Sequence, residues 1–310
     1  MLDSRLLKRI EEKKSTLDSL RPLPEAALRR LREDVEIEWI YHSNAIEGST
    51  ITLQETRLIL ETGLTIGGKS LREHFEVTNH HEAIQYVEAL VNEESVVTPF
   101  NVRQIHKLVL AKIDDDSAGN YRETQVRIAG AKHRPPDAWE IPARMTAWGE
   151  WLIEAEKDLH TVVLAALAHH RLVHIHPFVD GNGRTARLLM NLLLMKAGYP
   201  PAVISQRDRQ TYYRVLALAD DGKEKSLVNF VGRAVERNLT LYLEALIQQR
   251  KKPSENEQWI SLAEAAYGTP YSQEYLSLLA RKGRIEAIKD GRNWVTTRKA
   301  IQNYINSLEE

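Results

Sequence analysis

Residues 174–187 gather side chains that can bind phosphate and move protons. The stretch reads HIHPFVDGNGRTAR and combines imidazole, carboxylate, amide and guanidinium groups with two glycines. Near neutral pH, His176 is the nearby group that can accept a proton. Asp180 lies four residues further on and is of the type that holds Mg²⁺ against phosphate oxygens. These residue types together predict phosphate chemistry.

The glycines and arginines of this stretch indicate how an anion would be held. Gly181, Asn182 and Gly183 let the backbone adopt turns that are closed to other residues, just before the next helix begins. A helix start with free N–H groups binds anions, and phosphate best of all. Arg184 and Arg187 share one face of the first turns. Positive charge is unfavourable there against the helix dipole, so their placement indicates a polyanion between them.

Two apolar runs must position these side chains. Residues 159–173 lead into the stretch and residues 188–197 follow it, and both are typical of buried helices. The second run ends at Gly198-Tyr199-Pro200, a strong helix stop. The polar cluster is therefore predicted to lie on a turn between two core helices.

The stretch 176–187 resembles the Fic family motif H-x-F-x-[D/E]-G-N-G-R-x-x-R, and every fixed position is met. The resemblance implies transfer of AMP from ATP to a hydroxyl side chain of a target protein. It further implies that His176 is the general base and that Asp180 coordinates Mg²⁺. The ATP-binding residues that it implies within the stretch are Gly181, Asn182, Gly183, Arg184, Thr185 and Arg187.

A second segment, Ser43-Asn44-Ala45-Ile46-Glu47-Gly48, ends a predicted helix over 25–47. A carboxylate in the last turn of a helix is disfavoured by the dipole, so Glu47 needs a cation partner. The segment resembles the inhibitory [S/T]-x-x-x-E-[G/N] motif of Fic proteins. The resemblance implies that Ser43 and Glu47 are inhibitory, with Glu47 paired to Arg187 so that ATP binds unproductively. A plain solvated Glu47 is the alternative.

Residues 117–142 differ from the helical block around them. Residues 124–129 alternate polar and apolar side chains, which predicts a strand with an exposed edge. An exposed edge can accept an extended peptide as a further strand. The segment resembles the β-hairpin flap of Fic proteins, and a structural hairpin without a partner is the alternative. The residues expected to dock the target are Arg127, Ile128, Ala129 and Gly130.

Two further groups of residues leave alternatives open. Tyr212 and Tyr213 resemble a Tyr-Tyr pair that lines the adenine pocket of Fic proteins, although they could equally be core aromatics. Asp220 stands where many members have an asparagine that contacts the base, which puts the identity of the base in doubt. His170 and His174 have the spacing of a zinc pair, but no zincin glutamate accompanies them, so no histidine metal site is predicted.

The composition of the 310 residues is ordinary for a soluble globular protein, with 43% hydrophobic and 27% charged residues. A net charge of −1 implies no general attraction to nucleic acid or to a membrane. The chain has no cysteine, no apolar run of about 20 residues and a charged N-terminus. We therefore expect a cytoplasmic protein without disulfides.

A separate unit is predicted near the C-terminus, after a polar linker over 248–257. Residues 259–308 predict a helix, a turn, a second helix, a hairpin and a last helix, the order of a winged helix. Residues 281–299 contain seven basic and two acidic side chains, a local charge of +5 that suits contacts to DNA phosphates. The predicted second helix, 272–279, has no Arg or Lys to read bases, so a protein-binding or dimer-forming domain is the alternative.

The sequence thus predicts a mainly α protein: a Fic helical core with a β-hairpin flap, plus a small C-terminal winged-helix (α+β) domain. The expected domains are an N-terminal helical region over 1–95, a catalytic core over 96–248 and a winged helix over 258–310. The expected function is autoinhibited AMP transfer from ATP, with Mg²⁺, to a target protein or to the chain itself. The rivals are other phosphate transfer or AMP removal on the same scaffold, and a DNA-binding regulator with an ATP-sensing domain. A homodimer stays open.

Overall fold

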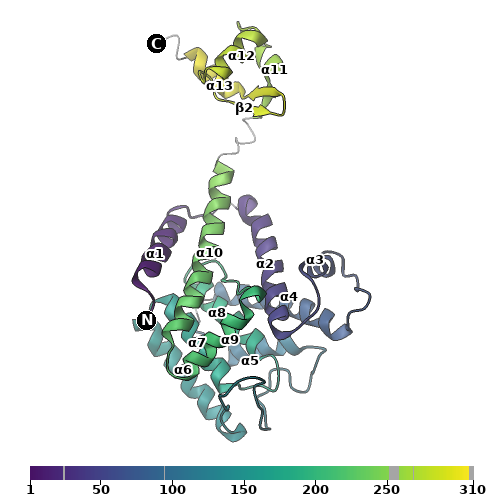
Figure 1. Ribbon diagram of the computed structural model, residues 1–310, viewed down its shortest axis with the longest axis vertical. Helices are drawn as coiled ribbons and strands as arrows, with labels where there is room; N and C mark the ends of the chain where they lie inside the picture. Colours follow the sequence, from purple (N-terminus) through teal and green to yellow (C-terminus); the bar gives the residue numbers. More distant parts are fainter. Residues whose placement is uncertain (24, 94, 251–257, 268, 307–310) are drawn as a thin grey trace. The chain divides into compact units, whose positions relative to one another are not determined.

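The computed structural model describes residues 1–23, 25–93, 95–250, 258–267 and 269–306. The chain divides into two compact units, Met1–Ala245 and Leu246–Glu310, and the mainly helical fold that the sequence predicts is confirmed. Figure 1 shows the helices of the larger unit. They are α1 (Ser4–Ser19), α2 (Glu25–Glu47), α3 (Leu53–Thr62), α4 (Leu71–Val91), α5 (Pro99–Leu110), α6 (Ile141–Asp158), α7 (Thr161–Ile175), α8 (Asn182–Lys196), α9 (Arg209–Asp220) and α10 (Lys225–Arg250), with short 3₁₀ turns η1 (Ala138–Glu140) and η2 (Gln206–Asp208).

Helices α7 and α8 pack against each other at the centre of the larger unit, as the two apolar runs predict. Residues 162–170 of α7 and 184–194 of α8 are buried without interruption. A helix that is apolar on all sides is stable only when other elements cover it. Helices α4 and α5 pack on α8, and α6 packs on α7. The turn between α7 and α8 therefore has a rigid base.

The predicted N-terminal region, 1–95, lies in the same compact unit as the predicted core, because α2 and α4 pack on α8. Local capping explains where two of its helices begin. Thr52 and Glu55 form a capping box at the start of α3, and Ser70 and Glu73 form another at α4. Most of the predicted linker, 248–257, lies outside the described residues.

The segment over 119–137, which we call the flap segment, differs from the prediction. Residues 124–129 do not form a strand, so the expected β-hairpin is absent from this described part of the chain. The flap segment instead follows an extended path that reverses in a turn, where the N–H of Ala131 donates to the carbonyl of Ile128. Gly130 has a φ of 76° in this turn. An alternating pattern without a neighbouring strand to pair with does not make a ladder.

The smaller unit has the order of elements that the sequence predicts, with one addition. A short strand at its start, β1, was not predicted and pairs with β3, so the three-stranded sheet has the order β1-β3-β2. Its apolar core joins residues of the helices to Ile260 and Ile285. The elements are β1 (Ile260–Ser261), α11 (Leu262–Ala266), α12 (Gln273–Arg281), β2 (Ala287–Asp290), β3 (Asn293–Thr296) and α13 (Arg298–Asn306).

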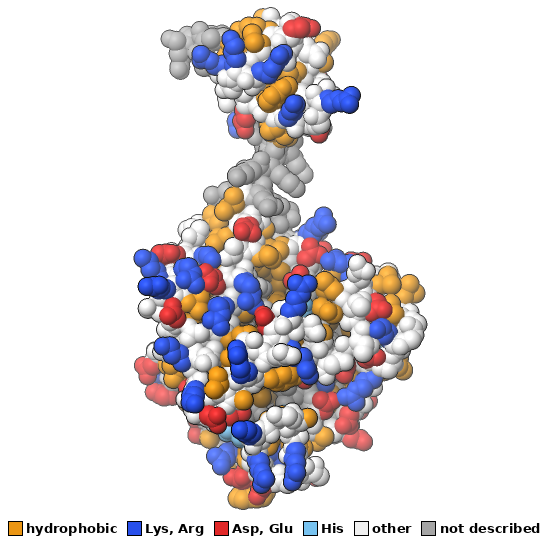
Figure 2. Space-filling view, viewed as in Figure 1, with side chains coloured by type: hydrophobic (Ala, Val, Ile, Leu, Met, Phe, Trp, Pro, Cys, Tyr) orange, Lys and Arg blue, Asp and Glu red, His pale blue; other side chains and the backbone are white. Residues whose placement is uncertain are grey.

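The surface of the larger unit carries charge of both signs. Figure 2 shows Lys and Arg side chains intermixed with Asp and Glu on the visible face. This agrees with the net charge of −1. Among the described helices, none combines the length and the apolarity that crossing a bilayer would require.

Candidate active site

The turn between α7 and α8 presents the free N–H groups of a helix start. Gly181 precedes the first residue of α8 and has a φ of 74°, the left-handed conformation that favours glycine. The first N–H groups of a helix have no acceptor within the helix, and they carry its positive dipole end. The backbone of the turn therefore has the conformation that the sequence predicts for an anion-binding helix start.

Asn182 shapes this turn from inside. Its amide nitrogen donates to the carbonyl of Phe178 at 2.9 Å, and its amide oxygen accepts from the N–H of Phe178 at 3.0 Å. Thr185 is also buried, and its hydroxyl has no hydrogen-bond partner in the structure. In this structure the two side chains face the protein, so a contribution of either to ATP binding stays a prediction.

Arg187 is held by the end of α2, the segment that the sequence singles out as inhibitory. Its Nη2 lies 2.7 Å from Glu47 Oε1 and 2.8 Å from the carbonyl oxygen of Ser43. Its Nε donates to Ser43 Oγ at 3.0 Å. The guanidinium is buried, whereas the side chain of Glu47 is 35% exposed. Burial opposes the charge of Arg187, but the nearby Glu47 carboxylate outweighs it and raises the pKa of Arg187.

Gly183 explains why the Glu47 carboxylate fits at the start of α8. A Cβ on Gly183 would collide with Glu47 Oε1 and would lie 3.1 Å from Arg187 Nη1. Gly183 has an ordinary helical φ, so the backbone conformation does not require a glycine there. The glycine is needed because a side chain would occupy the space of the Glu47 carboxylate. The Glu47 carboxylate thus lies against Gly183 in the first turn of α8 and beside an arginine, in the type of environment that a phosphate would favour.

Replacing Gly183 with alanine tests this close approach. In the otherwise unchanged chain, we expect the added methyl group to displace Glu47 and weaken its ion pair with Arg187. In a Glu47→Gly background the carboxylate is absent, and the added methyl group meets only the end of the Arg187 side chain, 3.1 Å away, so the same change should cost little. The free energies of unfolding from urea titrations should therefore show a coupling of about 1–2 kcal/mol between the two positions. Additive effects would contradict the contact.

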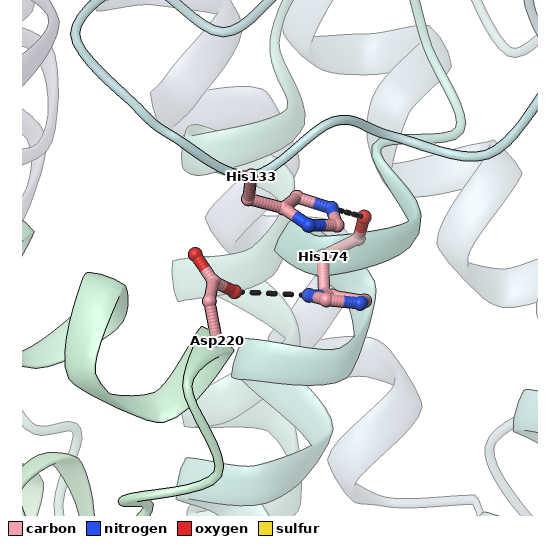
Figure 3. A group of neighbouring side chains, drawn as sticks. All are labelled: His133, His174 and Asp220. Carbon is pink, nitrogen blue, oxygen red and sulfur yellow. Dashed lines mark hydrogen bonds and ion pairs between the residues drawn. The ribbon is translucent and has the colours of Figure 1, made fainter.

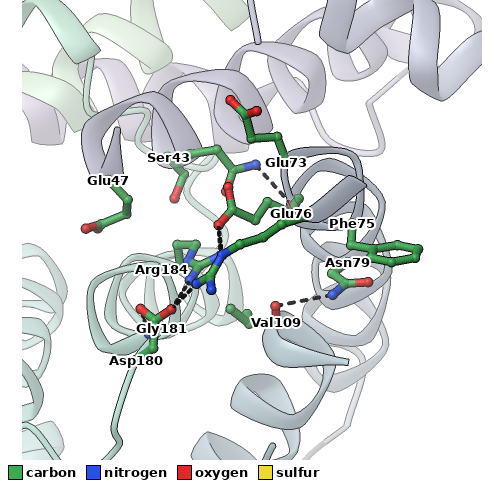
Figure 4. A network of polar contacts seen from close by, with 12 residues as sticks. Ser43, Glu47, Glu73, Phe75, Glu76, Asn79, Val109, Asp180, Gly181 and Arg184 are labelled. Carbon is green, nitrogen blue, oxygen red and sulfur yellow. Dashed lines mark hydrogen bonds and ion pairs between the residues drawn. The ribbon is translucent and has the colours of Figure 1, made fainter. Parts of the chain in front are cut away.

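Arg184 lies between two carboxylates beside the turn, as Figure 4 shows. Its Nη1 is 3.4 Å from Glu76 Oε1 and its Nη2 is 3.4 Å from Asp180 Oδ2. Its Nε and Nη1 are buried and have no hydrogen-bond partner. Buried donors without acceptors are unfavourable, so a ligand that supplies anionic oxygens would satisfy them. The predicted phosphate-binding role of Arg184 fits this observation.

Asp180 is placed so that it can serve a cation. Its side chain is 46% exposed, and its Oδ2 lies 2.5 Å from Arg72 Nη2. Burial alone would raise the pKa of Asp180, but the charge of Arg184, the N–H of Gly181 and the charge of Arg72 outweigh it and lower that pKa. The carboxylate is therefore ionised at neutral pH. An ionised, half-exposed carboxylate beside an anion-binding turn suits Mg²⁺, provided that Arg72 moves away.

His176 ends α7 in a left-handed conformation, with a φ of 52°. Its Nδ1 lies 3.3 Å from the carbonyl oxygen of Val173, which makes Nδ1 the protonated nitrogen and Nε2 the free base. Burial lowers the pKa of His176, and the Val173 carbonyl only partly offsets it. At pH 7 the imidazole is therefore neutral and able to accept a proton, as a general base requires.

Two residues that the sequence analysis did not single out hold this turn in place. His106 accepts from the N–H of Gly119 through Nδ1 at 3.0 Å and donates through Nε2 to the carbonyl of Asp180 at 3.0 Å. Its ring also stacks on Phe178 with centroids 3.6 Å apart. Burial lowers the pKa of His106 to about 4, so the ring stays neutral. It connects α5 to the turn that carries Asp180.

Arg122 is the second residue that holds the turn in place, and it connects the flap segment to the turn that carries His176. Its Nε donates to the carbonyl of His176 at 2.8 Å and its Nη2 to that of Pro136 at 2.6 Å. Its Nη1 donates to the carbonyl of Thr124 at 2.9 Å, and its backbone N–H donates to the carbonyl of Pro177 at 2.9 Å. One buried guanidinium therefore fixes both ends of the flap segment to the residues around His176.

We expect Arg122→Ala to lower the free energy of unfolding by about 3 kcal/mol, because it leaves several buried carbonyl groups without donors. Urea denaturation of the two proteins measures the difference. Arg127→Ala is the matched control, since Arg127 is an exposed arginine of the same segment. A loss below about 1 kcal/mol, no larger than that of an ordinary substitution, would show that Arg122 does not anchor the flap segment.

The two tyrosines that the sequence places near the adenine lie beside the inhibitory segment. Tyr212 is buried, its hydroxyl is 3.5 Å from Arg187 Nη1, and its pKa is raised to about 12 by burial. Tyr213 is 40% exposed and donates to the carbonyl of Ile46 at 3.3 Å. Their contact with a base stays a prediction. So does target docking by the exposed flap residues Arg127, Ala129 and Gly130 and the half-buried Ile128.

Comparison with known proteins identifies the family of this chain. Residues 97–194 match the model of the Fic/DOC family. A crystal structure of a Fic-domain-containing signaling protein from Bacteroides thetaiotaomicron is 32% identical, with a TM-score of 0.73, over 77% of this chain and 97% of that chain. The chain belongs to the Fic/DOC family. The Fic-1 structure from C. elegans is 33% identical, with a TM-score of 0.72, over 79% of this chain and 73% of that one.

Curated relatives of this Fic chain carry an activity in their name. The "Protein adenylyltransferase Fic" of Drosophila grimshawi is 42% identical over 243 residues, 78% of this chain. The match covers 50% of that relative, so this Fic chain spans about half the length of the curated relatives it matches. The match of 97–194 to the family model includes the whole of the turn that carries His176 and Arg187.

Proposed function

We propose that this Fic chain is a protein adenylyltransferase that moves AMP from ATP to a Ser, Thr or Tyr hydroxyl of a target protein. The observation that carries the proposal is the pairing of Arg187 with Glu47 beside the open start of α8. The Glu47 carboxylate occupies a position where a helix start and an arginine would stabilise a phosphate. The name of the curated relatives supports the same reaction.

The residues of the turn have separate roles in this reaction. The target hydroxyl attacks the α-phosphorus of ATP, and the free Nε2 of His176 takes the hydroxyl proton. The bond between the α-phosphorus and the bridging oxygen breaks, and pyrophosphate leaves. Arg184, Arg187 and the N–H groups of α8 hold the phosphates and stabilise the developing charge. Asp180 would hold Mg²⁺, which neutralises phosphate charge when bound.

Autoinhibition follows from the same contacts. While Glu47 is paired with Arg187, that arginine is not available to the far end of the triphosphate, and the α-phosphate is not aligned for attack. Two further bonds keep the end of α2 in place: Arg209 Nε and the hydroxyl of Tyr213 both donate to the carbonyl of Ile46. The part of the chain up to α4 would then serve as a regulatory region, and the Fic core as the catalytic one.

A nucleotide panel tests the proposed reaction against its rivals on the same scaffold. The Glu47→Gly protein is incubated with Mg²⁺ and one of ATP, GTP, UTP or CTP, and intact masses of the chain and of proteins from a lysate are measured. We expect the mass of one AMP to be added with ATP. Addition of UMP or of a single phosphate would replace the proposal with another transfer. Loss of AMP from a pre-modified protein, without any transfer, would indicate the reverse activity.

We also propose that the smaller unit is a winged helix that binds DNA. The observation that favours this is the exposure of the basic side chains around its hairpin, several of which Figure 2 shows on the visible face. They are Arg281, Lys282, Arg284, Lys289, Arg292, Arg298 and Lys299. Helix α12 presents Gln273, Glu274 and Tyr275 to solvent, so contacts to phosphates rather than to bases should dominate.

Gel-shift titrations at several salt concentrations test this second proposal. If the hairpin contacts several phosphates, the logarithm of the affinity falls linearly with the logarithm of the salt concentration. Each neutralised phosphate adds roughly 0.9 to the slope. We expect Lys289→Ala with Arg292→Ala to reduce the slope by about 2. The absence of binding at low salt would remove the DNA proposal and leave adenylyl transfer untouched.

A further inference from the structure

Three side chains that lie far apart in the sequence converge beside the flap segment. His133 comes from the flap segment, His174 from the last turn of α7 and Asp220 from the last residue of α9 (Figure 3). One potential ligand atom from each lies within 4.8 Å of the other two. In the described part of the chain this is the one group of three or more histidine and acidic side chains that meets this distance.

The hydrogen bond of the His133 ring leaves it in the tautomer that a metal ligand requires. Its Nε2 donates to the carbonyl of His174 at 2.8 Å, which leaves Nδ1 as the nitrogen with a free lone pair. A histidine that binds a metal nearly always donates its other ring N–H to a carbonyl or a carboxylate, because that bond fixes the tautomer and the ring orientation. The ring lies over that of His174, with centroids 3.7 Å apart.

The other two members are already in contact and have support from a neighbour. His174 Nδ1 is 2.9 Å from Asp220 Oδ1. His170, one turn earlier on α7, also places its Nε2 2.9 Å from Asp220 Oδ1 and so orients the carboxylate. The three members of the cluster are half-buried, which leaves the site accessible to an ion while limiting competition from water.

We propose that His133, His174 and Asp220 form a binding site for a divalent transition-metal ion, with Zn²⁺ as the ion that two imidazoles and a carboxylate suit best. Ligand atoms at about 2.0–2.1 Å from a tetrahedral ion are about 3.4 Å apart. The ligand atoms now lie up to 4.8 Å apart, so the widest spacing must shorten by up to about 1.4 Å, which a rotation of the His133 ring can supply, while the 2.9 Å between His174 Nδ1 and Asp220 Oδ1 must widen by about 0.5 Å. A water or a substrate group would take the fourth position.

The bound ion would join the flap segment to the core. His174 is two residues before His176, and Asp220 belongs to the helix that also carries Tyr212 and Tyr213. The ion would therefore hold His133, and with it the second half of the flap segment, against the end of α7. This site is separate from the Mg²⁺ role of Asp180 and does not depend on the proposed transfer activity.

Zinc titration of the tag-free, metal-stripped full chain tests the site by calorimetry. We expect one equivalent of Zn²⁺ to bind, and the affinity to fall at least tenfold in His133→Ala and in Asp220→Asn. His81→Ala is the control, because His81 also pairs with a carboxylate, Glu36, but without a third ligand. Thermal unfolding confirms that the variants fold. Binding that is absent, or that is equally strong in all four proteins, overturns the proposal.

Two further measurements report on the ligands and on the flap segment directly. Co²⁺ in the same site should give the visible absorption of a tetrahedral ion in the unmodified chain and lose it in both variants. Zn²⁺ should slow tryptic cleavage after the exposed residues Arg127 and Lys132 several-fold, while Mg²⁺ should not. Equal cleavage rates with and without Zn²⁺ would show that an ion, even if bound, does not hold the flap segment.

Discussion

Replacing Glu47 with glycine is expected to raise AMP transfer by roughly 10- to 100-fold, measured as label incorporated from ATP into the chain or a target. In the proposed mechanism, the unmodified chain must first break the ion pair between Glu47 and Arg187 before it reaches the active arrangement. Arg187 is buried while Glu47 is 35% exposed, so solvent screens part of the interaction and breaking it should cost about 1.5–3 kcal/mol. The glycine variant does not have this cost.

Glu38→Gly is the matched control for this experiment. Glu38 belongs to the same helix, α2, but is exposed, and it makes no contact with Arg187. Both changes place a glycine in α2 and lower its helix propensity, but only Glu47→Gly frees the arginine. A rise in both variants would mean that loosening of α2 causes activation. A rise in neither would contradict the inhibitory role of Glu47.

Replacing His176 with alanine is expected to lower AMP transfer by about 10²- to 10⁴-fold, the usual contribution of a positioned general base. The experiment is best done in the Glu47→Gly background, where the starting rate is highest. ATP affinity should change little, because His176 is not among the groups that hold the phosphates. Equilibrium binding of an ATP analogue measures this second quantity. A variant that still transfers AMP at the starting rate would exclude the general-base role.

The pH dependence of AMP transfer by the Glu47→Gly protein is a second test of His176 as the general base. Burial lowers the pKa of His176 below its usual value of 6.5, so the neutral, active form persists as the pH falls below 7. The rate should therefore be constant around pH 7 and decrease only on the acid side of 6.5. An acid limb centred above 6.5 would indicate a different base.

The arrangement of the turn could be predicted from the sequence because the motif is local. His176, Asp180 and the residues up to Arg187 lie within one loop and the first turns of one helix, so their spacing alone brings them together. The inhibitory contact was also predicted, because a carboxylate at the end of a helix needs a cation and the resemblance to the inhibitory motif pairs Glu47 with Arg187. The structure brings the two together over 140 positions of sequence.

The residues that hold the turn could not be found in the same way. Arg122 and His106 act through backbone carbonyl and N–H groups, and such contacts leave no pattern in the sequence. Arg72 and Glu76 reach Asp180 and Arg184 only because α4 packs on α8. In the sequence alone, each of these side chains looks like an ordinary charged or polar surface residue.

The flap segment and the histidine cluster show two limits of reasoning from spacing alone. The alternation over 124–129 predicted a strand, but no described neighbour pairs with it, so the backbone stays extended without a ladder. The spacing of the α7 histidines predicts no metal site, because the zincin glutamate is missing from their helix. The structure places His133 and Asp220, from two other elements, beside His174, and spacing along the sequence could not show that these three side chains meet.

The most direct test of the central claim uses ATP labelled at either the α- or the γ-phosphate. The Glu47→Gly chain is incubated with each form and Mg²⁺, and covalent label is counted in the chain and in a lysate. Because the cradle of Arg184, Arg187 and α8 is proposed to present the α-phosphate to the hydroxyl, label should come from the α position alone and disappear in the His176→Ala variant. Label from the γ position, or α label that survives without His176, would contradict the proposed reaction.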